Sequence, residues 1–157
     1  MTGPQHKVTN KRPRRAIIVM VLAAAAAMMS IFSRIENWKR DFTVNYAKLD
    51  PQSSDPQLRP LLVSQSPGEV AKLIEQWVEV HPKWSVESHD ELAGRIEIHL
   101  TRTTPLLRFT DDIHVRLAAD GRGTRVDAES QSRFGKGDLG QNPRNLKELM
   151  SGLREDR

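Results

Sequence analysis

The sequence of 157 residues contains no cysteine, so the chain can form neither a disulfide nor a zinc ribbon and has no thiol nucleophile. It also lacks the Gly-Lys-Ser or Gly-Lys-Thr of a phosphate-binding loop and the Gly-x-Ser-x-Gly of many serine hydrolases. Several classes of metal site and enzyme are thereby excluded. The missing cysteine does not locate the protein, because cysteine-free chains are compatible with every compartment.

Acidic residues are missing from the first 33 positions, although the chain as a whole has a net charge of +4. The basic residues of that region are Lys7, Lys11, Arg12, Arg14 and Arg15. The remainder holds 19 of the 24 lysines and arginines against all 20 acidic residues, a net charge of −1. The basic character therefore belongs to a tail at residues 1–15. A nucleic-acid partner needs a basic face on the folded part, so none is expected.

Charged residues are also absent from residues 16–33, AIIVMVLAAAAAMMSIFS. Eighteen helical residues span about 27 Å, close to the roughly 30 Å hydrocarbon core of a bilayer. Mixed charges follow at Arg34, Glu36, Lys39, Arg40 and Asp41, and Trp38 fits an interfacial anchor. The positive-inside rule then predicts a single-pass signal anchor in the inner (cytoplasmic) membrane, with the N-terminus cytoplasmic and the C-terminal domain outside. The lipid bilayer would be the partner of residues 16–33.

Three alternatives for residues 16–33 remain open. A cleaved signal peptide is one, although its apolar region usually has about 7–15 residues and large residues follow the alanines here. Arg14-Arg15 suggests a twin-arginine signal, but the surrounding pattern is poor. A buried core helix is the third. Both export signals, like the anchor, place the following domain outside the cytoplasm.

Residues 34–60 are expected to form a spacer, and residues 61–157 one folded domain. The segment KLDPQSSDPQLRP has three prolines, two serines and few apolar residues, typical of an extended segment that lies over the domain or tethers it. Ser66-Pro67-Gly68-Glu69 is a capping box with proline at the first helical position. Apolar residues then recur at helical spacing, at Val70, Leu73, Ile74, Trp77 and Val78.

Beyond this helix the apolar period changes to two. Residues 95–102, 112–118 and 124–132 each alternate apolar with polar side chains, and residues 84–90 form a weaker fourth strand. Asp120-Gly121-Arg122-Gly123 suits a hairpin turn. A last helix is expected with Asn142 as N-cap and Pro143 in its first position. The predicted fold class is α+β, an antiparallel meander of about four strands packed with two helices, preceded by the membrane helix.

Residues 135–140, GKGDLG, match the Gly-x-Gly-x-x-Gly of dinucleotide-binding turns. Such a turn opens a strand-helix-strand unit, and a parallel strand must follow its helix. Here the helix begins near residue 143 and the sequence ends at residue 157. We therefore expect a tight connection between the last strand and the last helix, with no nucleotide.

Two histidines, His99 and His114, fall on the polar side of strands expected to be neighbours. Such a pair can bind a metal, but only if the two residues are in register, and no third ligand is evident. The alternative is that both are solvated strand residues, and neither a metal nor a cofactor is expected.

Asp111 and Asp112 are adjacent on a strand, so their side chains point to opposite faces. Asp111 falls on the core side, where an unpaired charge is very costly. Its candidate partners are Arg108, Arg133 and the backbone amides of the glycine loop. The expected ligand-binding or structural network comprises Arg108, Asp111, Asp112, Ser130, Arg133, Asp138 and Asn142. Such carboxylates gather at functional sites as well as in structural networks.

Two linked motifs in the C-terminal half resemble the family called domain of unknown function 1499, over about residues 60 to 154. The matching residues are Arg108, Phe109, Asp111, Asp112, Ser130, Ser132, Arg133, Gly135, Asp138, Leu139, Gly140 and Asn142. Unlike many members, this chain has no cysteine near the start of the domain, and it has Glu129 where an arginine often stands. The resemblance implies an exported or membrane-associated bacterial domain without an established activity or cofactor.

The function predicted from these observations is non-catalytic binding of a protein, lipid or envelope ligand by a membrane-anchored domain. The anchor, the near-neutral domain and the absence of a catalytic constellation favour it. The alternative is an envelope hydrolase that uses Asp111, Asp112 or Asp138 with Arg133.

Overall fold

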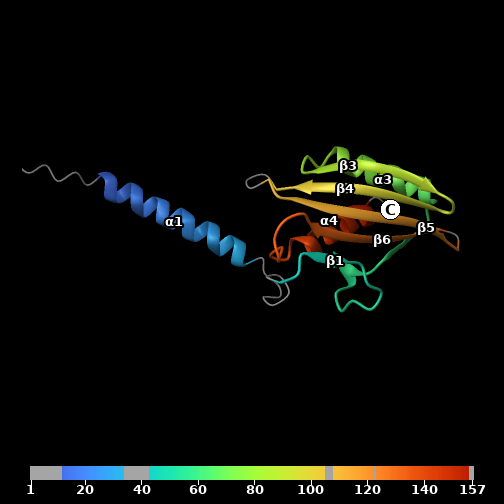
Figure 1. The fold of residues 1–157 in the computed structure, drawn as a ribbon, viewed down its shortest axis with the longest axis horizontal. Coiled ribbons are helices and arrows are strands. Elements are labelled where there is room, and N and C mark those ends of the chain that lie inside the picture. The colour runs from blue at the N-terminus through green and yellow to red at the C-terminus, as the bar shows by residue number, and fades with distance from the viewer. Residues whose placement is uncertain (1–11, 34–42, 105–107, 122, 156–157) are drawn as a thin grey trace, which may run out of the picture. The chain divides into compact units, whose positions relative to one another are not determined.

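The computed structural model describes residues 12–33, 43–104, 108–121 and 123–155 (Figure 1). The chain divides into two units, Met1–Glu36 and Asn37–Arg157. The first contains helix α1 (Arg12–Phe32), whose described side chains are exposed. Within the described ranges, no helix has both the length and the hydropathy needed to cross a membrane. The tail up to residue 11 and residues 34–42, with the predicted anchor Trp38, lie outside the described residues.

The second unit is an α+β domain, as predicted, with one antiparallel sheet and two long helices. Its elements are β1 (Tyr46–Lys48), the short 3-10 helix η1 (Pro56–Leu58), β2 (Leu61–Val63), α3 (Pro67–Glu79), β3 (Trp84–Leu92), β4 (Arg95–Thr103), β5 (Thr110–Asp120), β6 (Gly123–Ser132) and α4 (Gln141–Glu155). The strand order is β1-β6-β5-β4-β3, and β2 also pairs with β6. Helix α3 packs on β3, β4 and β5, and α4 packs on β6 and β1 (Figure 1).

The four long strands confirm the predicted meander. Apolar residues of β4, β5 and β6 alternate with polar ones, and the apolar set is buried against α3 and α4. Because side chains of a strand alternate between faces, the same alternation leaves the opposite sheet face polar, and among the described residues of this unit no helix packs on it. Trp77 of α3 packs edge-on against Trp84 at 5.0 Å between ring centroids, which joins the helix layer to β3.

The sheet has six strands, two more than the four predicted. The additional strands β1 and β2 have three residues each and pair with different parts of β6, at Glu129–Gln131 and Thr124–Val126. Three residues are too few for a period-two pattern to be detected in the sequence. Strand β1 comes from the segment expected to be a spacer, and Leu49 after it is buried in the core. This segment thus lies along the edge of the sheet.

Both helix starts depend on side-chain caps. The capping box before α3 is confirmed, because the Ser66 hydroxyl accepts a hydrogen bond from the Glu69 amide and the Glu69 carboxylate accepts one from the Ser66 amide. The predicted N-cap of α4 is wrong, because that helix begins at Gln141. The Asp138 carboxylate accepts hydrogen bonds from the amides of Gly140 at 2.8 Å and Asn142 at 2.6 Å. Positive φ angles at Leu139 (52°) and Gly140 (75°) turn the chain so that Asp138 reaches these amides.

Candidate functional site

The predicted site residues are divided between the two faces of the sheet. Asp111 lies on the face covered by the helices and is 2% exposed. Asp112 lies on the open face, with Arg133 beside it. The alternation expected of adjacent strand residues is therefore present, and it separates the predicted network into two groups with different surroundings.

On the covered face, Asp111 is bound by a residue that the sequence did not single out. The Asn145 side-chain amide donates to the Asp111 carboxylate at 2.9 Å and to the Ser130 hydroxyl at 3.2 Å. The candidate partners Arg108, Arg133 and the glycine-loop amides are thus replaced here by an amide of α4. The available signal was the spacing of Asn142 and Asn145, because residues three apart share one face of a helix.

Asn142 is the centre of the same buried network. Its carbonyl oxygen accepts from the Ser130 hydroxyl at 2.6 Å, and its amide donates to the Asn45 carbonyl at 2.7 Å and the Ser132 hydroxyl at 3.1 Å. Asn142 and Asn145 are both 0% exposed. The network therefore joins α4 to β5, to β6 and to the residue that precedes β1, and every contact named here is internal to the domain.

A cation also lies on the covered face. Arg102 of β4 stands opposite Asp111 in the strand register, and its side chain is 11% exposed. Its Nε atom lies 3.3 Å from a Glu148 carboxylate oxygen, an ion contact without hydrogen-bond geometry. Because a buried charge is stable only when it is compensated, Arg102 and Glu148 offset each other beneath the sheet.

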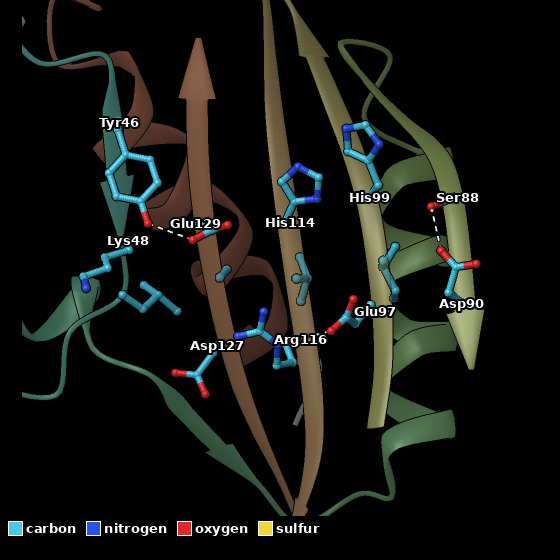
Figure 2. A pocket seen from close by; sticks show the side chains of 14 residues that line it. Tyr46, Lys48, Ser88, Asp90, Glu97, His99, His114, Arg116, Asp127 and Glu129 are labelled. Atoms are coloured by element: carbon cyan, nitrogen blue, oxygen red, sulfur yellow. Dashed lines mark hydrogen bonds and ion pairs between the residues drawn. The ribbon is translucent and has the colours of Figure 1, made fainter. Parts of the chain in front are cut away.

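On the open face, His99 and His114 are in register on β4 and β5, and their rings stack with centroids 4.5 Å apart and an interplanar angle of 17°. The register that a metal-binding pair would need is therefore present. His99 Nε2 lies 2.8 Å from Asp112 Oδ1. Figure 2 shows the two imidazoles side by side above neighbouring strands.

Asp112 is held by two neighbours. Arg133 donates from Nε to Oδ2 at 2.8 Å and from Nη2 to Oδ1 at 2.7 Å, a bidentate pair. Hydrogen bonding by Arg133, and then by His99, lowers the pKa of Asp112 to about 2, although burial acts in the opposite sense. The same pairing raises the pKa of Arg133. An ionised carboxylate only accepts hydrogen bonds, so Nε2 of His99 carries the proton of this bond. In a neutral ring Nδ1 is then the nitrogen that accepts.

The histidine pair lies in an open hollow of about 700 Å³ on the polar sheet face, which we call the open-face hollow (Figure 2). The charged residues that line it are Lys48, Asp90, Glu97, Arg116, Asp127 and Glu129. Several are held in place, since Tyr46 donates to Glu129 at 2.7 Å and Ser88 donates to Asp90 at 3.1 Å. Burial, followed by the bond to Glu129, raises the pKa of Tyr46 to about 12. The hollow is thus a partly ordered polar surface.

The remaining motif residues lie at one end of the sheet. Arg108 is exposed and has a positive φ of 51° in the connection between β4 and β5. The glycine loop joins β6 to α4 as predicted, and the Asn45 side chain donates to the Gly135 carbonyl at 2.9 Å. Within the described residues, no group of three or more His, Asp or Glu side chains is arranged to hold a metal ion.

The chain matches a known protein family. The profile of the family described as protein of unknown function (DUF1499) matches residues 22–153, which is 132 of the 157 residues. The match includes both motifs and extends upstream through β1 into α1. No curated protein matches the chain. The chain therefore belongs to the DUF1499 family of proteins of unknown function.

Proposed function

We propose that this protein is a non-catalytic binding module whose open-face hollow takes a polar ligand that carries positive charge. The observation that carries the proposal is the uncovered sheet face. Four carboxylates, at Asp90, Glu97, Asp127 and Glu129, line the hollow beside the cations Lys48 and Arg116. Glu97 and Asp127 are paired with arginines, whereas Asp90 and Glu129 accept hydrogen bonds from the neutral hydroxyls of Ser88 and Tyr46. Clefts lined mainly by one sign of charge attract ligands of the opposite sign.

Preorganised side chains support binding at this face. The long antiparallel pairings of β4, β5 and β6 fix the backbone. Glu129 is held by Tyr46, and Glu97 is contacted by Arg95 at 3.0 Å. Side chains that are already ordered lose less conformational entropy when a ligand binds.

The three carboxylates of the hydrolase alternative have other partners. Asp111 is buried against Asn145, Asp138 caps α4, and Asp112 is paired with Arg133. A general acid or base needs access to the substrate and a pKa near the working pH, whereas the pKa of Asp112 is about 2. These surroundings favour binding over the catalytic roles first considered for these residues.

The proposal includes the membrane anchor, which rests on the sequence. Residues 16–33 carry no charge, and basic residues precede them. Protease added to spheroplasts tests it, because the anchored topology exposes the C-terminal domain to digestion. A domain that stays intact until the membrane is dissolved would refute this topology.

The binding proposal is tested by nuclear magnetic resonance on the ¹⁵N-labelled full-length protein in neutral detergent. A hexalysine peptide is expected to shift the amide signals around Glu97, His114 and Asp127, whereas a hexaglutamate peptide leaves them unchanged. Glu97→Gln should weaken the hexalysine effect several-fold. Glu79→Gln, on the exposed surface of α3, is the matched control and should leave it unchanged. Equal effects of the two substitutions, or shifts only with hexaglutamate, would contradict the proposal.

One observation favours a second candidate, a hydrolase of the envelope that uses His99 as general base. Asp112 orients His99 at 2.8 Å, as a carboxylate orients the histidine of a catalytic triad. Ester substrates of graded chain length, assayed with the wild type and with His99→Ala, test this candidate. Turnover abolished by His99→Ala supports it, and turnover that survives the substitution rejects it.

A further inference from the structure

Exposed aromatic side chains gather at the end of the sheet where β4 meets β5 and β6 meets α4. Phe109 is 51% exposed and Phe134 is 74% exposed. The two lie on neighbouring segments, because the Arg133 amide donates to the Thr110 carbonyl at 3.1 Å. Large apolar side chains that remain exposed together mark surfaces that contact another apolar phase.

The backbone holds Phe109 in this position. The Phe109 amide donates to the Thr104 hydroxyl at 3.0 Å, and the Arg108 amide donates to the Thr104 carbonyl at 3.1 Å. Arg108 adopts a left-handed φ of 51°, which is uncommon for a residue with a side chain. These local hydrogen bonds fix the backbone between β4 and β5, and in this backbone conformation the Phe109 side chain is half exposed.

Basic side chains accompany the two phenylalanines. Arg108 and Lys136 are exposed. The nearby carboxylates are engaged within the domain, because Asp112 is paired with Arg133 and Asp138 accepts two backbone amides at the start of α4. This end of the domain therefore presents aromatic side chains beside positive charges, the combination found on proteins that lie at anionic membrane surfaces.

The chain joins the domain at this same end. The Asn45 carbonyl accepts from the Ser132 amide at 3.0 Å, and the Asn45 side chain donates to the Gly135 carbonyl at 2.9 Å. Val44, just before it, is 40% exposed. Ten residues separate Ser33 from Val44, and even fully extended they span about 40 Å at most. A bilayer that holds residues 16–33 is therefore within reach.

We propose that this end, defined by Val44, Arg108, Phe109, Phe134 and Lys136 and called the docking end, binds the anionic surface of the bilayer that carries the anchor. The inference rests on the proposed membrane anchor and adds an orientation to it. With the docking end on the lipid, the strands run away from the bilayer and the open-face hollow faces sideways. The hollow then stays accessible to a ligand.

The absence of cysteine provides a clean test, because one introduced cysteine can be labelled alone. Full-length Phe134→Cys is labelled with acrylodan and reconstituted into phosphatidylcholine vesicles with or without phosphatidylglycerol. Leu92→Cys is the control, since Leu92 is 45% exposed at the opposite end of β3. Acrylodan emission is expected to shift to the blue at position 134 in the anionic vesicles and to stay unchanged at position 92.

A second substitution tests the electrostatic part. Arg108→Glu with Lys136→Glu should reduce the docked population at least tenfold in anionic vesicles, because each basic residue near such a surface contributes about fivefold. Protein that floats with the vesicles while label 134 stays unshifted overturns the docking and leaves the anchor intact. Protein that does not float with the vesicles refutes the anchor as well. A shift that depends on protein concentration without vesicles overturns the proposal in favour of a second copy of the chain.

Discussion

Asp111 and Asp112 are neighbours on β5, yet their surroundings differ in almost every respect. Asp111 is 2% exposed and is bound by the neutral amide of Asn145. Asp112 is partly exposed and is clamped by Arg133 beside a stacked histidine pair. The first belongs to a network that joins the helices to the sheet, and the second to a surface that is open to ligands. The same family motif thus supplies both a folding element and part of a candidate site.

This comparison changes how the motif is interpreted. Ser130, Ser132, Asp138 and Asn142 all contribute to the junction between α4, β6 and the residues before β1. Their side chains satisfy one another and the backbone, as buried polar groups must. A sequence signature can therefore record what a junction needs in order to fold, and the ligand-binding residues can lie outside it.

The largest loss of stability is expected from a substitution in the buried network on the covered face. Asn142→Ala removes the hydrogen bonds to Ser130, Ser132 and Asn45 and leaves buried polar groups unpaired, so the free energy of unfolding should fall by about 2–4 kcal/mol. Gln131→Ala, an exposed position on β6, should change it by less than about 0.5 kcal/mol. Urea denaturation followed by circular dichroism measures both. Similar losses for the two variants would show that the faces do not differ in this way.

A smaller effect is expected at Asp112, and it depends on pH. The pKa of Asp112 in the folded protein, about 2, lies below the ordinary value of 3.8. The unfolded chain therefore takes up the proton first as the pH falls. The stability contributed by ionised Asp112 is complete above about pH 5 and is lost as the pH falls toward 2.

Asp112→Asn isolates that contribution. At pH 7 it should lower the free energy of unfolding by about 1 kcal/mol once solvent screening is allowed for. The difference between wild type and variant should disappear near pH 2. Thermal unfolding at a series of pH values measures it, and a difference that does not vary with pH would indicate that packing, and not charge, stabilises Asp112.

The smallest effect on stability is expected at the edge of the open face, where Tyr46 bonds to Glu129. Tyr46 is the single tyrosine of the chain, so phenolate absorbance reports on it alone. Its pKa of about 12 should appear as a midpoint two pH units above that of free tyrosine. Since the folded state keeps this proton longer than the unfolded chain, the contribution of Tyr46 to stability is lost as the pH rises from about 10 to 12.

Glu129→Gln should move the Tyr46 midpoint part of the way back toward 10, because burial, the larger cause, remains. Its effect on stability at pH 7 should stay below about 1 kcal/mol. Lys48→Gln, on the same short strand, serves as a control for the loss of a charge. An unchanged Tyr46 midpoint in Glu129→Gln would show that the hydrogen bond from Tyr46 to Glu129 does not hold the Glu129 side chain in place.

Much of the fold could be predicted from the sequence because its signals are local. The period-two alternation predicted the four long strands, and Ser66 with Glu69 predicted the start of α3. The strands β1 and β2 were missed because three residues carry no period. The start of α4 was misplaced because Asn142 followed by Pro143 fits a helix start by residue type alone. The carboxylate that accepts the first amides belongs to Asp138, which the turn at Leu139 and Gly140 brings within reach.

The candidate site was predicted less completely, because its contacts depend on tertiary structure. The alternation rule correctly placed Asp111 and Asp112 on opposite faces. However, the partner of Asp111 comes from a helix 34 residues away in sequence, and the pairing of His99 with Asp112 depends on strand register. Periodicity assigns a residue to a face, but it does not determine which residue of another element comes within hydrogen-bond distance.

Asn45 also has a mechanical consequence. The chain runs from Asn45 directly into β1, which is antiparallel to β6, so tension on the preceding segment would peel β1 from β6 one residue at a time. Before Tyr46 can separate, the bonds that join Asn45 to Ser132, Gly135 and Asn142 must break. The bonds of Asn45, including the one from the Asn142 side chain, therefore resist tension on the chain before the pairing of β1 with β6 is loaded.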